Sequence, residues 1–247
     1  MEEKEPVTGG KLKASHKAMW TVIALLVLAK LVETVIHIPS MNPSQQAIFS
    51  WKSLGFFVAL LLLGSGFAHI IGFPGMWDEK VTNRQRIWAP LGIGLVVGVA
   101  LLAIDRAVGF AHLYAMALGS SSLAVPLPYS LLVQGYDAVC AATMFTLFGV
   151  AFSVWFFGTL LLSRHWPRAT FWVLAVIVSA IEPLSMASQR HWALFHVAPV
   201  SAGLAAILML VYVMDLTGAI LLRRFGFTAA LVMRISAVFV WHIIGKL

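Results

Sequence analysis

Seven long apolar segments constrain this chain more than any other feature of its sequence. An apolar segment of roughly 20 residues crosses the hydrocarbon core of a bilayer as a helix. The segments are continuously apolar rather than alternating with polar residues, which excludes a transmembrane β-barrel. The sequence therefore predicts an all-α fold, a polytopic transmembrane helix bundle of about seven spans. The predicted spans are residues 19–38, 54–73, 89–104, 129–162, 170–187, 201–222 and 228–244.

The composition leaves room for little besides this bundle. Hydrophobic residues make up 60% of the 247 residues and charged residues 11%, whereas soluble domains carry about 25% charged residues. Residues 1–17 are rich in Lys and Glu and lack a cleavage site, so we expect a solvated cytoplasmic tail rather than a signal peptide. Residues 18–247 are then expected to form a single transmembrane helical domain.

The basic residues between the spans predict the orientation of the chain. With the N-terminus inside, eleven Lys and Arg residues fall on the cytoplasmic side and four on the other side, as the positive-inside rule requires. We expect a multi-pass protein of a bacterial inner membrane, and no nucleic-acid partner despite the net charge of +7. The cytoplasmic residues are Lys4, Lys11, Lys13, Lys17, Lys80, Arg84, Arg86, Arg164, Arg168, Arg223 and Arg224; the others are Lys52, Arg106, Arg190 and Lys246.

Three stretches leave the number of spans open between seven and eight. Residues 109–118 and 192–200 are apolar but too short to span, and residues 129–162 exceed what one upright helix needs. Re-entrant or interfacial helices would account for all three.

The segment 127–148 carries the first family resemblance. It opens with Pro128-Tyr129-Ser130-Leu131-Leu132 and continues into a long apolar run. It resembles the fourth-helix region of the CPBP family, the CAAX prenyl proteases and bacteriocin-processing proteins, where a Pro-x-Ser-Leu-Leu entry precedes E-E-x-x-x-R. The two Glu positions of that motif fall on Ala141 and Ala142 in this chain, and the Arg position falls on Thr146.

The end of the chain resembles the same family. Residues 218–234, with Arg224-Phe225-Gly226 at their centre, are similar to its penultimate helix, R-x-G turn and final helix. The H-x-x-x-N/D pair of the final helix falls on Arg234 and Val238.

Between these two segments, residues 171–187 resemble the helix that bears the family's F-x-x-x-H pair. That pair falls on Pro183 and Ala187, or on Trp192 and His196 in an alternative register.

The resemblance covers roughly the last half of the chain and implies a CPBP-like fold without the family's chemistry. In family members two Glu and two His gather around a metal or an activated water for proteolysis within the membrane. Alanine provides neither a base nor a metal ligand, so the resemblance implies a pseudoenzyme without a metal. We expect a non-catalytic subunit or scaffold of a membrane protein complex, in contact with lipids and other integral membrane proteins. No cofactor is expected; a lipid, quinone or pigment would suit such a bundle as a bound ligand.

Polar residues within apolar segments are costly and count as candidate functional groups. Lys30, Glu33 and His37 share one face of the first predicted helix. We interpret them as a local ion pair turned toward the bundle, with a proton path or ligand site as the alternative.

Arg234 needs an anionic partner because a guanidinium does not deprotonate. We predict a structural ion pair between Asp137 and Arg234, because the resemblance brings their helices together. Glu182 and Asp215 are competing partners, with Asp215 ranked last because we expect it nearer a membrane edge.

Two other functions remain open. The first is a hydrolase whose active residues have migrated, using Glu182, His196 and His242. The second is a carrier of protons or small molecules along a polar path; its candidate residues are Lys30, Glu33, Asp137, Asp215 and Arg234.

The small residues predict close contacts between helices, but they do not indicate whether the contacting helix belongs to this chain or to a partner. Gly64 and Gly66 in one span, and Gly92, Gly94 and Gly98 in the next, would let another helix approach within the bundle or from a partner. Both interpretations remain open. The single cysteine, Cys140, permits no internal disulfide and is expected to be a packing residue.

Overall fold

The computed structural model describes residues 9–36, 38, 41, 43–109, 125–162, 167–190 and 198–244. Over these residues the chain forms helices and no strands. The helices are α1 (Gly9–Ile36), α2 (Pro43–Ile48), α3 (Trp51–Ile70), η1 (Arg84–Trp88), α4 (Ala89–Val108), α6 (Tyr129–Ala141), η2 (Ala142–Val150), α7 (Ala151–Ser153), η3 (Val154–Leu161), α8 (Pro167–Ser179), α9 (Ile181–Arg190), α10 (Ala198–Phe225), α11 (Phe227–Val238) and η5 (Phe239–Ile243), where η marks π-helical segments.

The prediction of a polytopic helical membrane bundle is confirmed. In the described part of the chain, six helices are long and apolar enough to cross a membrane, and a shorter apolar helix covers Phe227–Ile243. These seven helices coincide with the seven predicted spans. The long segment 129–161 forms one run of consecutive helical elements from α6 to η3. Residues 110–118 and 191–197 lie outside the described residues, so the alternative of an eighth span stays a prediction.

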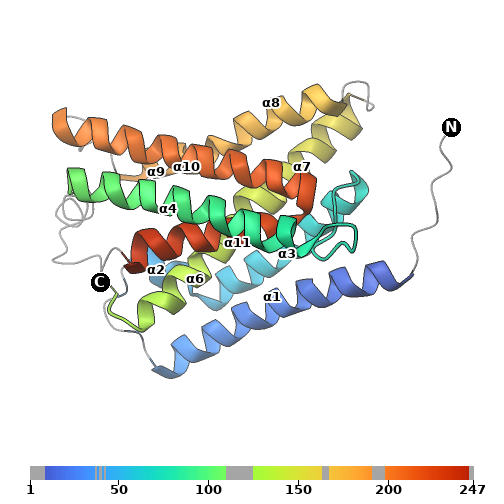
Figure 1. The fold of residues 1–247 in the computed structure, drawn as a ribbon. Helices are drawn as coiled ribbons and strands as arrows, with labels where there is room; N and C mark the ends of the chain where they lie inside the picture. The colour runs from blue at the N-terminus through green and yellow to red at the C-terminus, as the bar shows by residue number, and fades with distance from the viewer. Residues whose placement is uncertain are drawn as a thin grey trace.

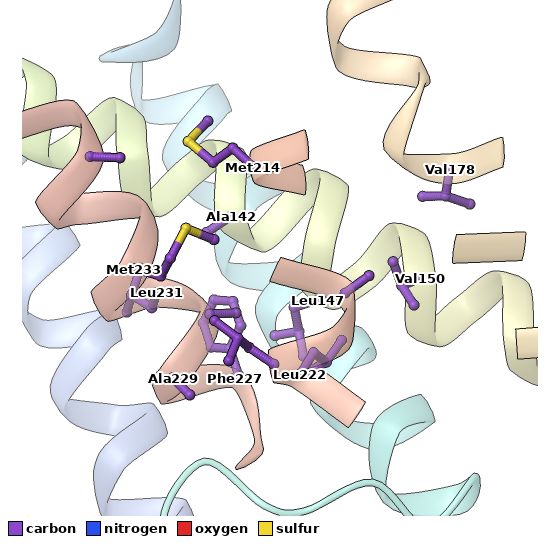
Figure 2. Packing of buried hydrophobic residues seen from close by; sticks show 14 of the residues in the cluster. Ala142, Leu147, Val150, Val178, Met214, Leu222, Phe227, Ala229, Leu231 and Met233 are labelled. Atoms are coloured by element: carbon purple, nitrogen blue, oxygen red, sulfur yellow. The ribbon is translucent and has the colours of Figure 1, made fainter. Parts of the chain in front are cut away.

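Helix α11 occupies the middle of the bundle (Figure 1). It packs against α4, α10 and α6. Helix α1 lies along one edge of the bundle and packs against α3 and α6. The buried side chains of η2, α10 and α11 point toward one another and form a continuous apolar core (Figure 2). Residues of this core include Ala142, Leu147, Met214, Leu222, Phe227 and Met233.

Contacts between distant segments fix which helix ends meet. The backbone N–H of Met76, in the loop after α3, donates to Ser15 Oγ at 2.9 Å. Thr228 at the start of α11 donates to the carbonyl of Met76. Gly226, at the α10–α11 turn, has a φ of +84°, and a Cβ there would overlap the carbonyl oxygen of Gly75. The start of α1, the loop after α3 and the α10–α11 turn therefore lie at one end of the bundle.

A hydrogen bond at the other end joins the segment after α11 to α4, and the two helices run in the same direction. The indole Nε1 of Trp241 donates to Asp105 Oδ2 at 3.1 Å. Asp105 is near the end of α4, and Trp241 follows α11 in η5. Gly94 of α4 meets Met233 of α11 and Gly98 meets Ala237, so the two helices are parallel neighbours.

Two glycines allow this close approach between α4 and α11. A methyl group at Gly94 would overlap the carbonyl oxygen of Met233 and the hydroxyl of Ser236, and one at Gly98 would lie 2.6 Å from the carbonyl oxygen of Ala237. By contrast, a Cβ at Gly92 would meet nothing within 4 Å. The glycines of this segment therefore divide between the bundle interior and its outer surface.

The same division holds on α3. A Cβ at Gly64 would lie 2.9 Å from Leu147 Cγ and 3.1 Å from the backbone of Phe148, whereas one at Gly66 would meet nothing within 4 Å. Gly64 thus seats α3 against η2, and Gly66 faces outward.

We predict that Gly94→Ala and Gly98→Ala destabilise the protein by about 1–3 kcal/mol each, because the added methyl groups force apart two backbones that cannot yield locally. Gly92→Ala is the matched control. It should leave stability unchanged or raise it slightly, since alanine favours helix by about 1 kcal/mol over glycine. Thermal unfolding in detergent measures all three, and a Gly98→Ala variant as stable as Gly92→Ala would contradict the close packing.

Candidate functional site

Arg234 is the centre of the one buried network of ion pairs that links three helices in the described part of the chain. Its side chain is 6% exposed. Nη1 donates to Asp215 Oδ1 at 2.7 Å, and Nη2 donates to Glu182 Oε1. We call Glu182, Asp215 and Arg234 the ion triad.

The backbone turn at Gly226 explains how two of these residues meet. Asp215 stands 11 residues before Gly226 on α10, and Arg234 stands 8 residues after it on α11. At roughly 1.5 Å per residue, both side chains start about 12–16 Å from the turn. That depth is near the middle of a hydrocarbon core about 30 Å thick. The third member, Glu182, comes from the first turn of α9.

Asp137 is not the direct partner of Arg234, which corrects the predicted ion pair. Helix α6 does pack against α11, and Asp137 is close enough to feel the charges of Arg234 and Glu182. The ion pairs of Arg234 among the described residues are nevertheless those with Glu182 and Asp215. The reason is geometric, because carboxylates of α9 and α10 already engage both terminal nitrogens.

The ranking of Asp215 as the weakest candidate was also wrong. Asp215 lies near the middle of the apolar span Ala202–Phe225 rather than near its end, and its side chain is only 2% exposed. The sequence does carry a signal for this arrangement, since Glu182 and Asp215 are carboxylates within otherwise apolar segments and Arg234 needs an anion.

The site has more negative than positive charge. The carboxylates of Glu182 and Asp215 pair with one guanidinium, and a third carboxylate, that of Asp137, lies near enough to interact with them electrostatically. Within the described structure, Glu182 Oε2 and Asp215 Oδ2 are buried without a hydrogen-bond partner. Asp137, an exposed residue of α6, lies near this buried pair. The site therefore holds more carboxylates than cations, and an unbalanced charge is expensive in a low-dielectric interior.

Among the described residues, the positions that the resemblance aligns with the CPBP catalytic motifs hold no carboxylate or imidazole. Ala142 and Thr146 are buried in the core, and Ala141 is half-buried beside them. Thr146 faces Gly218 of α10, where a Cβ would lie 3.2 Å from its Oγ1. Ala187 on α9 and Val238 on α11 are half-buried, and Pro183 on α9 is buried. Trp192 and His196 of the alternative register lie outside the described residues.

The described residues cover only part of the migrated-hydrolase alternative. Glu182 belongs to the ion triad, and His242 stacks on Trp241 with ring centroids 4.1 Å apart. His196 lies outside the described residues. Over the described residues, no group of three or more His, Cys, Asp or Glu side chains is arranged to hold a metal ion.

A separate ion pair lies on α1. Lys30 contacts Glu33, and its ammonium lies 5.6 Å from the ring centroid of Trp51. Lys30 is 8% exposed, so the pair neutralises a charge that α1 buries against α3. His37, the third residue of the predicted polar cluster, lies outside the described residues.

Comparisons with known proteins add no family to this picture. A scan against family models, a search of curated proteins and a search of solved structures each found no match to the chain. The resemblance to the CPBP family is therefore carried by the quoted residues alone.

We predict that Arg234→Leu destabilises the protein by about 3–5 kcal/mol, because it leaves buried carboxylates without their counter-charge. Neutralising the whole triad, with Glu182→Gln, Asp215→Asn and Arg234→Met, should recover most of that loss. Thermal unfolding in detergent gives the comparison.

Asp137→Asn is the matched control for this series, since it removes a nearby carboxylate that makes no ion pair with Arg234 in the described structure. It should change the melting temperature little. Rescue of Arg234→Leu by Asp137→Leu, without rescue by the triad changes, would show that Asp137 is the direct partner after all.

Proposed function

We propose that this chain is a non-catalytic, CPBP-like integral membrane protein that serves as a subunit or scaffold of a membrane protein complex. The observation that supports this best is the ion triad. Arg234 stands where the resemblance puts the first histidine of the final helix, and it is ion-paired with Glu182 and Asp215. A guanidinium held in this way neither binds a metal nor accepts a proton.

The replaced Glu positions support the same proposal. A water nucleophile needs a carboxylate base or a metal, and Ala141 and Ala142 provide neither. The third replaced position, Thr146, is 3% exposed and packs within the core. Proteolysis by the family's chemistry therefore has no base at its expected place.

The outer surface of the bundle offers places where another membrane helix can pack. Gly55, Ala59 and Gly66 are exposed on one face of α3, and no atom lies within 4 Å of a Cβ built at either glycine. Small residues on a lipid-facing surface allow a second helix to approach closely. Since Gly64, Gly94 and Gly98 already serve contacts inside the bundle, the outward glycines are free for a partner.

We predict that the protein extracted in mild detergent migrates on native gels together with another integral membrane protein, identified by mass spectrometry. Gly55→Leu and Gly66→Leu should reduce that co-migration, because they fill the space a partner helix would occupy. Leu25→Met, on the exposed surface of α1 and away from this face, is the control and should change nothing. A solitary monomer would contradict the scaffold proposal, and stoichiometric zinc with peptide cleavage would replace it with the hydrolase.

Proton carriage is the second candidate function, favoured by the excess of carboxylates at the ion triad and by the exposed Asp137 beside it. The test uses proteoliposomes that enclose a pH-sensitive dye and receive an external acid pulse. For a scaffold, we expect their interior to acidify no faster than that of protein-free liposomes. Proton flux that is lost in Asp137→Asn, while Glu33→Gln retains it, would establish carriage instead.

We further propose an N-terminus inside and a location in a bacterial inner membrane, on the strength of the basic asymmetry. Lys80 and Lys52 are both exposed and flank opposite ends of α3. In a Cys140→Ala background, Lys52→Cys should react with an impermeant thiol reagent added to intact cells, and Lys80→Cys should react only after lysis. The reverse labelling pattern would invert the orientation.

A further inference from the structure

Three arginines gather at the end of the bundle that holds the α10–α11 turn. Arg168 lies in the first turn of α8, and Arg223 and Arg224 lie in the last turn of α10. The charges of Arg168 and Arg224 both act on Arg223. In the described part of the chain, the ion pairs involve Lys30 and Arg234 and none of these three arginines.

Helix electrostatics account for part of this arrangement only. Arg223 and Arg224 suit the negative end of α10, where cations are stabilised. Arg168 stands at the positive end of α8, where the helix dipole disfavours a cation and favours an anion. Like charges held together at a membrane surface repel one another. A shared anion would relieve this repulsion and use the N–H groups of the first turn of α8.

The arginines lie at the ends of two apolar spans, where lipid headgroups meet a membrane protein. Arg168 begins the apolar span Arg168–Ala187, and Arg223 is close to the end of the span Ala202–Phe225. The Arg223 guanidinium lies 4.2 Å from the ring centroid of Phe171. This stacking holds a half-buried charge at the boundary between the apolar core and water.

An exposed apolar stripe runs along α8 from this cluster toward the middle of the membrane. Trp172 and Val176 follow Arg168 at helical spacing, and they are 44% and 45% exposed. Val173 and Ile177 widen the stripe, at 58% and 56% exposed. A ligand that joins an anionic group to long hydrocarbon chains would contact the arginines and this stripe together.

We propose that Arg168, Arg223 and Arg224 form a binding site for the phosphate headgroup of an anionic phospholipid whose acyl chains lie along the exposed stripe of α8. Basic clusters at the ends of transmembrane helices are the recognised chemistry for such headgroups, and each cation contributes about a five-fold gain in affinity. The continuity of arginines and apolar stripe selects a lipid over a free phosphate, which would use the arginines alone. The site does not depend on the scaffold proposal, since it uses no residue of the ion triad.

Native mass spectrometry of the whole protein tests the site directly. The protein is mixed in detergent with phosphatidylglycerol or with phosphatidylcholine, and the lipid-bound fraction is measured. Phosphatidylglycerol should be retained preferentially by the unaltered protein. Arg168→Gln combined with Arg224→Gln should weaken that preference by about ten-fold or more, as the loss of two surface cations predicts. Both side chains are exposed, so this variant should keep its melting temperature.

Arg84→Gln is the matched control, because Arg84 is an exposed arginine at the start of η1, outside the cluster. It should leave lipid retention unchanged. An equal loss in Arg84→Gln would reduce the effect to general surface charge and overturn the site. Inorganic phosphate that displaces phosphatidylglycerol completely, or retention of both lipids alike, would overturn the lipid assignment. Val173→Asn, which interrupts the apolar stripe, should weaken retention of the lipid while leaving any phosphate binding unchanged.

Discussion

The permanent charge of Arg234 is the constraint on which the arrangement of the C-terminal helices depends. A guanidinium in the middle of a bilayer cannot neutralise itself by losing a proton, so it must be paired where it stands. Asp215 reaches it at 2.7 Å from α10, and Glu182 reaches it from α9. The pairing requires three helices to converge at one depth, and the turn at Gly226 sets that depth for two of them.

Close backbone contact provides the second constraint. Lipid chains are as apolar as the side chains that face them, so helices in a bilayer associate through packing and polar contacts rather than through the hydrophobic effect. Gly94 and Gly98 let α4 lie directly against α11, where their positions leave no room for a methyl group. The hydroxyl of Ser236, which donates to the carbonyl of Met233 at 2.9 Å, lies in this contact without an unsatisfied proton.

Much of the fold could be predicted from the sequence, because the length and continuity of apolar segments report directly on membrane spans. All seven predicted spans are helices of the structure. Pairing inside the bundle could not be predicted in the same way. Periodicity along one helix does not say which neighbouring helix its polar face meets. For this reason the sequence leads to Asp137 rather than Asp215 as the predicted ion-pair partner of Arg234. The glycines were ambiguous for the same reason, since Gly92 and Gly94 are two residues apart and have opposite environments.

The ion triad specifies how three helices are aligned, even though burying its charges costs free energy. Buried ion pairs seldom stabilise a fold more than well-packed apolar residues would, but they can specify one arrangement among several. Three apolar helices in lipid could slide along one another by a turn with little change in packing energy. The pairing of Arg234 with Glu182 and Asp215 makes each such displacement expose a charge to hydrocarbon. The interior then fixes the relative positions of α9, α10 and α11.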